Sequence, residues 1–271
     1  MHSVDFFAAH PVFTRQEFHT ARQVERKRSV RTTDSILTRA VASGRLLHVR
    51  RGIYAVVPRG TTAAELRIDP FLVASKLAPD AAVAYHAALQ FRGKAYSIWH
   101  RFSVLSRLSI RPLDFEGVEI FGVRPPLRVR ARRDLGGGIV SEPYAGGNVR
   151  VTTLERTLVD VLDAPKLGGG WEEIWRSLES IEYFDLDAVV AYALALGSAL
   201  TAARVGYFLE QHRGALFVEE RHLRPLRKRA PAQPRYLDST RETGRLIKGW
   251  NLVVPERVHA RTWEEAGDAV A

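Results

Sequence analysis

The chain has 271 residues, of which 46% are hydrophobic and 26% charged, an ordinary composition for a protein with a buried core. It contains no cysteine, which excludes disulfides, thiolate zinc sites and cysteine nucleophiles. The net charge of +10 is uneven, because residues 1–60 hold 11 Lys and Arg against four acids, whereas the other 211 residues hold 29 against 26. A basic N-terminal part favours a module that binds nucleic-acid phosphates, and a merely solvated basic surface is the alternative.

The opening residues do not form a secretory signal, because Asp5, His10 and Pro11 interrupt their short apolar stretches. No uncharged run in the chain approaches the roughly 18 residues that a membrane span needs. We therefore expect a cytoplasmic protein that does not contact a membrane.

Two short helices are predicted at the start of the chain. Residues 5–9 match the end of the first helix, which His10-Pro11 terminates, since the residue before proline avoids the helical region. Thr14-Arg15-Gln16-Glu17 has the pattern of a capping box, in which Thr14 and Glu17 each bond the other's backbone amide. This pattern predicts a second helix over residues 15–23.

A third helix is predicted to follow a charged turn at residues 25–28. Thr32, Thr33 and Asp34 are candidate caps, and Gly44 suits the left-handed position that ends a helix. Between them, apolar side chains recur with helical period at Ile36, Leu37, Ala40 and Val41. We interpret this segment as a recognition helix.

A basic hairpin is predicted after the third helix. Residues 46–57 contain two β-prone runs around Arg50-Arg51-Gly52, where Gly52 can supply the positive φ that a tight turn needs. Three helices and a hairpin in about 55 residues are the order of a winged helix-turn-helix, whose wing contacts phosphates or a minor groove.

In such modules the start of the recognition helix faces base edges and the neighbouring basic residues hold the DNA backbone. The candidate base-reading residues are Arg31, Thr32, Thr33, Ser35 and Arg39. The candidate phosphate contacts are Arg26, Lys27, Arg28, Arg50 and Arg51. For Thr32, Thr33 and Ser35 the alternative is a capping role without DNA contact.

A polar linker at residues 58–62 divides the chain into an N-terminal winged helix-turn-helix, residues 1–60, and a larger mixed α/β domain, residues 61–271. The predicted fold class is therefore α+β. Helices are expected over residues 70–77, 81–91, 152–163, 171–179, 186–196 and 199–212. Strands are expected over residues 101–106, 117–123, 128–132, 148–152 and 252–255, the last of which would close the sheet.

Three local patterns add detail to the prediction for the second domain. Thr152-Thr153-Leu154-Glu155 is a further capping box. The stripe of Trp171, Ile174, Trp175 and Leu178 is typical of a buried helix face. The basic run from Arg221 to Arg229 is interpreted as a solvated loop, with a second nucleic-acid contact as the alternative.

The sequence offers weak support for catalysis. Gly136-Gly137-Gly138 and Gly168-Gly169-Gly170 lack the Lys-Ser/Thr of a phosphate loop and are interpreted as turns. No His-x-x-x-His pair occurs among the nine histidines, and Ser198 is expected to cap a helix.

Arg156 and Asp160 are interpreted as an ordinary surface ion pair, and His86 as a structural hydrogen-bonding residue. The alternative is that Asp160 and Asp163 bind a metal, which would need further acids converging on them. We predict no catalytic residue, no cofactor and no metal.

Five segments in order resemble the AbiEi-type antitoxins of type IV toxin-antitoxin systems. They are His10-Pro11-Val12-Phe13-Thr14, Val49-Arg50-Arg51-Gly52-Ile53-Tyr54, Tyr85-His86-Ala87-Ala88-Leu89, the ten residues from Val151 to Asp160, and Trp250-Asn251-Leu252-Val253-Val254. The wing pattern alone is shared by many winged-helix regulators, so the order of the segments over some 250 residues carries the resemblance.

The resemblance implies a repressor that binds double-stranded operator DNA of its own operon and an antitoxin that counteracts a nucleotidyltransferase toxin, often in phage defence. It places no antitoxicity residues in residues 61–271. Two alternatives stay open, a metal-dependent nuclease guided by the winged helix and a stand-alone transcription factor with a sensing domain.

Overall fold

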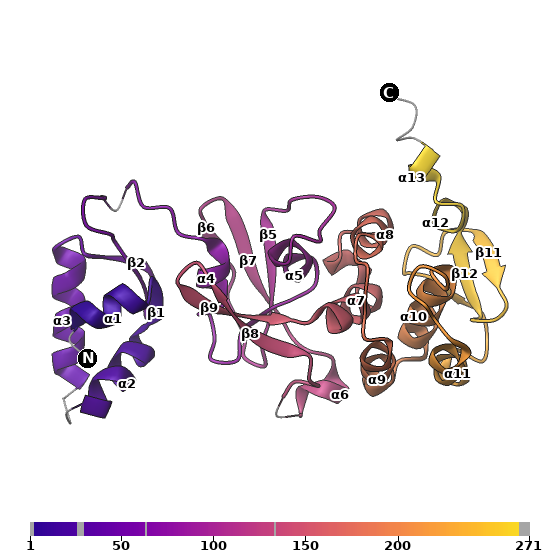
Figure 1. The fold of residues 1–271 in the computed structure, drawn as a ribbon, viewed down its shortest axis with the longest axis horizontal. Coiled ribbons are helices and arrows are strands. Elements are labelled where there is room, and N and C mark those ends of the chain that lie inside the picture. Colours follow the sequence, from indigo (N-terminus) through magenta and orange to yellow (C-terminus); the bar gives the residue numbers. More distant parts are fainter. Residues whose placement is uncertain (1–2, 26–29, 63, 133, 266–271) are drawn as a thin grey trace. The chain divides into compact units, whose positions relative to one another are not determined.

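The computed structural model describes residues 3–25, 30–62, 64–132 and 134–265 (Figure 1). It combines helices with three β-sheets, which confirms the predicted α+β class. The chain forms two compact units. The first contains Met1–Val83, Val104–Val123 and Ser141–Val151, and the second contains Ala84–Ser103, Arg124–Val140 and Thr152–Ala271.

The first unit begins with a winged helix-turn-helix. Its elements are α1 (Ser3–Ala9), β1 (Val12–Thr14), α2 (Arg15–Glu25), α3 (Val30–Ala42), β2 (Leu46–Arg50) and β3 (Ile53–Val56). The strands form an antiparallel sheet in the order β1-β3-β2. Buried aromatic and aliphatic side chains fill the module, with Phe6, Phe7, Phe13 and Phe18 packed against Leu37, Ala40 and Leu46 of α3 and β2.

The predicted capping box at the start of α2 is present. The Thr14 amide donates to Glu17 Oε2 at 2.7 Å, and the Glu17 amide donates to Thr14 Oγ1 at 3.1 Å. Gly44 follows α3 with φ +68°, as expected for the residue that ends a helix. Strand β1 was missed, because three residues carry no periodic signal and become a strand only by pairing with β3.

The predicted caps of the third helix are wrong. Helix α3 already includes Val30, so Thr32, Thr33 and Asp34 lie within it. Thr33 is buried with its hydroxyl 3.3 Å from His19 Nδ1, and Asp34 forms an ion pair with Arg15. These two side chains therefore contact α2 instead of capping their own helix.

The first unit also contains the greater part of a six-stranded sheet. Its order is β6-β7-β5-β4-β9-β8, formed by Leu113–Phe115, Val118–Val123, Arg101–Leu105, Ala82–Val83, Gly147–Thr152 and Ile139–Tyr144. Strand β4 runs antiparallel to β5 and parallel to β9. Helix α4 (Pro70–Ala74) starts with Asp69 as its cap. The helix predicted over residues 81–91 is wrong in its first half, where β4 enters the sheet.

The second unit is mainly helical. Its helices are α5 (His86–Phe91), α6 (Leu127–Arg130), α7 (Leu154–Asp163), the 3-10 turn η1 (Pro165–Leu167), α8 (Trp171–Glu179), α9 (Leu186–Leu196), α10 (Ala199–Gln211), α11 (Glu220–Arg229), α12 (Glu256–His259) and α13 (Thr262–Glu265). A small sheet has the order β10-β12-β11, from Arg235–Tyr236, Leu252–Pro255 and Gly244–Ile247. The prediction that residues 252–255 close the large sheet is therefore wrong.

Two further predictions in the second unit need correction. The strand predicted over residues 128–132 is wrong, because Pro126 precedes a helical turn, α6, in which Val129 is buried and which Ala131 ends. The capping box before α7 is displaced by one residue, since Thr152 ends β9 and Thr153 caps the helix by accepting from the Arg156 amide at 3.4 Å. The stripe on α8 is buried as predicted, and Ser198 caps α10.

Gly206 shows how closely the second unit is packed. It lies in α10, where an added Cβ would collide with the ring of Trp250. Trp250 is fully buried and donates from Nε1 to Glu210 Oε2 at 2.7 Å. A glycine is needed here because the indole occupies the space that a side chain would take.

We therefore expect Gly206→Ala to lower the free energy of unfolding by about 1–3 kcal/mol through overpacking. Helix propensity alone predicts the opposite, namely that the substitution raises the free energy of unfolding by about 0.5–1 kcal/mol. Gly214→Ala is the control, since an added Cβ there meets no atom within 4 Å. Urea denaturation measures both, and a Gly206→Ala variant as stable as the wild type would refute the packing argument.

Candidate nucleic-acid interface

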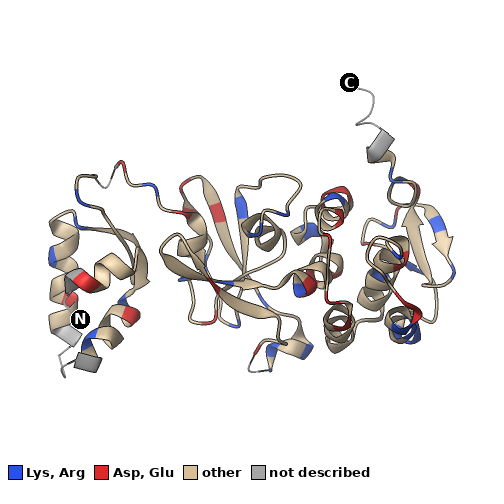
Figure 2. Ribbon diagram, in the orientation of Figure 1, with Lys and Arg blue, Asp and Glu red and all other residues tan. Residues whose placement is uncertain are grey.

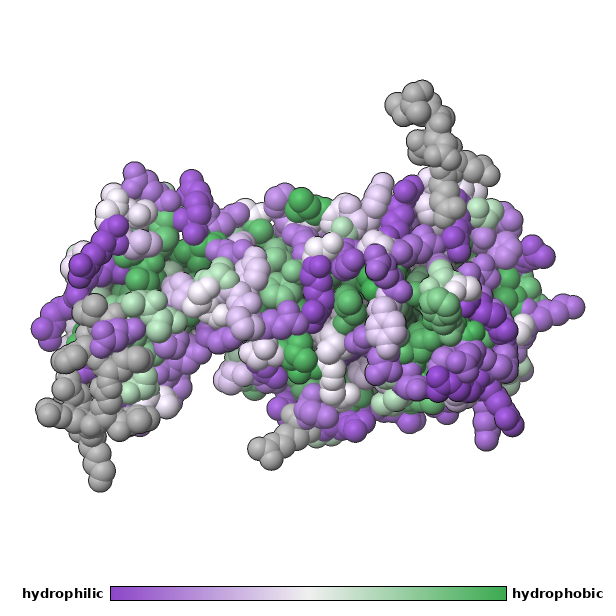
Figure 3. Space-filling model, viewed as in Figure 1, coloured by the Kyte–Doolittle hydropathy of each residue, from purple (hydrophilic) through white to green (hydrophobic). Residues whose placement is uncertain are grey.

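One face of α3 is exposed and polar. Thr32, Ser35 and Arg39 are all exposed, and their spacing of three and four residues places them on the same side of the helix. The opposite side packs Leu37 and Ala40 into the core. Figure 3 shows mainly hydrophilic residues on the visible surface at the α3 end of the first unit. The helix can therefore present polar groups outward without exposing its apolar stripe.

Of the other two predicted base-reading residues, one is buried and one lies at the start of α3, whereas three of the predicted phosphate contacts fall outside the described residues. Thr33 is 1% exposed, so its hydroxyl faces the interior of the module and cannot reach a base edge. Arg31 belongs to the first turn of α3. Arg26, Lys27 and Arg28 lie outside the described residues.

The wing is a tight turn held against the start of α2. Gly52 has φ +80°, as the hairpin pattern predicted, and its carbonyl accepts from the Arg15 amide at 2.7 Å. Arg51 is exposed at the tip, and Arg50 Nη1 donates to the Arg111 carbonyl at 2.8 Å. The turn therefore carries two adjacent guanidinium groups on a fixed backbone.

Ion pairing decides which of these cations remain available to an anion. Arg15 makes two parallel bonds to Asp34, Nε to Oδ1 at 2.6 Å and Nη2 to Oδ2 at 2.7 Å, which lower the pKa of that carboxyl. Within the described part of the chain, no carboxylate forms an ion pair with Arg39, Arg50 or Arg51. These three arginines keep their full charge for a phosphate.

The aspartates considered for metal binding are parts of a buried network. Asp160 and Arg156 are each 1% exposed, with Nε and Oδ2 3.1 Å apart, so the predicted surface ion pair is wrong. Burial raises the pKa of Asp160, which also accepts from Tyr192 Oη at 2.8 Å. Asp163 is bonded to the Thr201 hydroxyl. No group of three or more His, Asp or Glu residues suited to a metal occurs among the residues that the structure describes.

His86 is buried beside Glu173, as expected for a structural hydrogen-bonding residue. Its Nε2 lies 2.9 Å from Glu173 Oε1, and its ring stacks on Trp99 at 4.4 Å between centroids. Ser97 adds its amide at 3.0 Å and its hydroxyl at 2.6 Å to the same carboxylate. Burial opposes the ionisation of Glu173, but the hydrogen bonds from His86 and Ser97 outweigh it and lower its pKa to about 2.

This pKa predicts a dependence of stability on pH. Because the pKa of Glu173 is about 2 when folded and near 4.5 when unfolded, its contribution is complete above about pH 4.5 and is lost as the pH falls toward 2. We expect Glu173→Gln to remove on the order of 3 kcal/mol of pH-dependent stability over that range. Glu172→Gln, at an exposed surface pair with Arg176, is the control. Equal pH profiles for the two variants in denaturant titrations would rule out the role of Glu173.

The basic run at 221–229 is helix α11 and not a solvated loop (Figure 2). Its buried side chains are His222, Leu223 and Leu226. Arg221 pairs with Asp187 and Glu219, and Arg227 pairs with Glu210 and Glu220. The partners Asp187 and Glu210 attach α11 to α9 and α10, and the pairs involve two of its five basic side chains.

No helix in the described part of the chain is long and apolar enough to cross a membrane.

Comparison with known proteins finds a family match for the N-terminal module. Residues 4–57 match the family model described as "Transcriptional regulator, AbiEi antitoxin". The search of curated proteins finds no match. Among solved structures, the RV2827C protein of Mycobacterium tuberculosis is similar with a TM-score of 0.53 and 19% identity, over 94% of this chain and 89% of that one. At this identity the likeness shows a shared fold.

Proposed function

Because residues 4–57 match the family model of AbiEi antitoxin transcriptional regulators, we propose that this protein is a sequence-specific DNA-binding repressor that controls its own operon. Residues 1–60 are its DNA-binding domain and residues 61–271 its antitoxin-like domain. The proposed ligand is double-stranded operator DNA. The proposed site of action is the cytoplasm.

The observation that carries the proposal is the pairing of an exposed polar face on α3 with a rigid basic wing. In winged-helix modules the recognition helix enters the major groove and the wing holds the backbone. Thr32, Ser35 and Arg39 are the proposed base-reading residues, together with Arg31 at the start of the helix. Arg50 and Arg51 are the proposed phosphate contacts, with Arg26, Lys27 and Arg28 beside them in the sequence. Thr33 is left out of this set because it is buried.

Replacing both wing arginines by alanine is expected to weaken DNA binding and to reduce its salt dependence. Each lost phosphate contact removes about 0.9 from the slope of log K against log salt, so Arg50→Ala/Arg51→Ala is expected to reduce it by about one to two. Fluorescence anisotropy with a duplex from the promoter of the gene measures the slope. The control is Arg213→Ala/Arg257→Ala, which removes the same charge from two exposed ion pairs. Equal slopes for both variants would exclude the wing as a phosphate contact.

We further propose that the protein counteracts a nucleotidyltransferase toxin, in a type IV system that serves phage defence. This proposal rests on the family of the N-terminal module and on the resemblance of the later segments. Its test is co-expression with a nucleotidyltransferase encoded beside the gene. Restored growth supports it, and continued growth arrest in cells that contain the folded protein counts against it.

We propose no catalytic residue, cofactor or metal for this regulator. The nuclease alternative loses its specific support, since Asp160 and Asp163 are both engaged in hydrogen bonds inside the second unit. Incubation with DNA, RNA and magnesium tests this, and hydrolysis that disappears in Asp160→Ala would reopen the alternative.

A further inference from the structure

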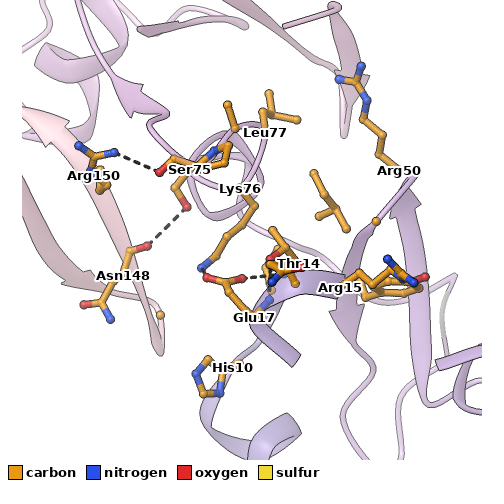
Figure 4. Close-up of a pocket in the computed structure, with 18 of the residues that line it drawn as sticks. His10, Thr14, Arg15, Glu17, Arg50, Ser75, Lys76, Leu77, Asn148 and Arg150 are labelled. Atoms are coloured by element: carbon orange, nitrogen blue, oxygen red, sulfur yellow. Dashed lines mark hydrogen bonds and ion pairs between the residues drawn. The ribbon is translucent and has the colours of Figure 1, made fainter. Parts of the chain in front are cut away.

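A large basic cavity lies in the first unit beside the wing. Its volume is about 1430 Å³, and it is lined by the start of α2, the wing turn and residues 75–79, 109–111 and 146–150 (Figure 4). Six of the lining residues are Lys or Arg, whereas Glu17 is the one acid among them. The cavity therefore concentrates positive charge from segments that are far apart in the sequence.

Four of these cations are not neutralised. Lys76 is paired with Glu17 at 2.6 Å and Arg15 with Asp34 at 2.6 Å. For the remaining four, the described residues provide no carboxylate partner; they are Arg50, Arg51, Arg111 and Arg150. Guanidinium groups that share a cavity repel one another, and an anion bound among them would relieve that repulsion.

Two of the four are held by neutral acceptors. Arg50 Nη1 donates to the Arg111 carbonyl at 2.8 Å, and Arg150 Nη1 donates to the Pro79 carbonyl at 3.4 Å. A carbonyl orients a guanidinium without cancelling its charge, and each side chain keeps further N–H donors of the five it carries. The arrangement therefore presents oriented donors to an anion with several oxygens, such as a phosphate.

The cavity is continuous with the proposed DNA interface, because Arg50, Arg51 and Gly52 belong to both. Arg111 and Arg150 line this same cavity together with the two wing arginines. A free phosphate or nucleotide would satisfy the same donors, but it would leave unexplained why the wing arginines contribute to the lining.

We propose that the cavity binds the phosphodiester backbone of DNA, with Arg111 and Arg150 holding phosphates beside those held by the wing. This inference rests on the proposed function. It extends the DNA interface from the winged helix to residues of the second proposed domain. These two arginines contribute affinity without reading bases, because phosphates carry no direct sequence information.

The test is Arg111→Ala/Arg150→Ala in the full chain, measured by anisotropy with a mixed-sequence 30-base-pair duplex between 50 and 200 mM salt. We expect weaker binding and a salt slope reduced by about one to two, because two phosphate contacts are lost. The control is again Arg213→Ala/Arg257→Ala, which has the same net charge. Circular dichroism establishes that each variant is folded, and the single variants Arg111→Lys and Arg150→Lys, which keep the charge, are expected to retain the wild-type slope.

The outcomes separate this inference from the proposed function. Absence of DNA binding by the wild type would overturn both. A second outcome would overturn the inference but not the proposed function. In that outcome DNA binding depends on Arg50 and Arg51, but Arg111→Ala/Arg150→Ala has the same salt slope as the control variant. Saturable binding of inorganic phosphate that requires Arg111 and Arg150, with an unchanged DNA slope, would also overturn it by assigning the cavity to a small anion.

Discussion

Arg156→Ala is expected to lower the free energy of unfolding by about 3–5 kcal/mol, because it leaves the Asp160 carboxyl buried without the guanidinium that pairs with it. The guanidinium also donates from Nη1 to the Leu135 carbonyl at 3.0 Å and to the Gly137 carbonyl at 2.5 Å. Its loss therefore removes the contacts that tie the loop before β8 to α7. Guanidinium chloride denaturation at pH 7 measures the change.

Two further variants define the cause of this destabilisation. Arg213→Ala removes an exposed arginine with a surface partner and is expected to cost about 0–1 kcal/mol. Adding Asp160→Asn to Arg156→Ala removes the unpaired carboxyl and is expected to recover part of the loss, in a double-mutant cycle. A loss at Arg156 no larger than that at Arg213 would mean that the buried pair is not required for stability.

Reversing the charge of Arg39 and Arg51 is expected to weaken DNA binding by about 100-fold or more, equivalent to about 2.7 kcal/mol. These two exposed arginines lie on α3 and at the wing tip, and a glutamate at either place would repel phosphates as well as lose a contact. The measurement is the Kd for promoter DNA at fixed salt, with Arg39→Glu/Arg51→Glu compared with Arg213→Glu/Arg257→Glu. Similar losses in both would show that net charge alone governs binding.

The winged helix could be predicted because its signals are local. The capping box at Thr14 and Glu17 and the left-handed glycines Gly44 and Gly52 are each set by a few neighbouring residues. The prediction that Thr33 and Asp34 cap α3 is wrong because their contacts are not local. Their partners lie on α2, which is distant in the sequence.

The second unit was harder to predict because long-range packing decides its details. The i, i+4 spacing of Arg156 and Asp160 is the same for a surface pair and a buried one, and only the surrounding fold removes them from water. The strand at Leu252–Pro255 was found, but no sequence pattern indicates which sheet it joins. In the first unit, too, long-range packing decides the cavity, because no sequence pattern indicates that Arg111 and Arg150 line it together with the wing.

Specific DNA binding is the central claim, and the most direct test is the ratio of two dissociation constants at 150 mM salt. One is for a duplex from the promoter of the gene, and the other is for a mixed-sequence duplex of equal length. For a sequence-specific regulator we expect the promoter duplex to bind about a thousand-fold more tightly. Equal affinity for the two duplexes would contradict the account of this protein as a repressor of its own operon.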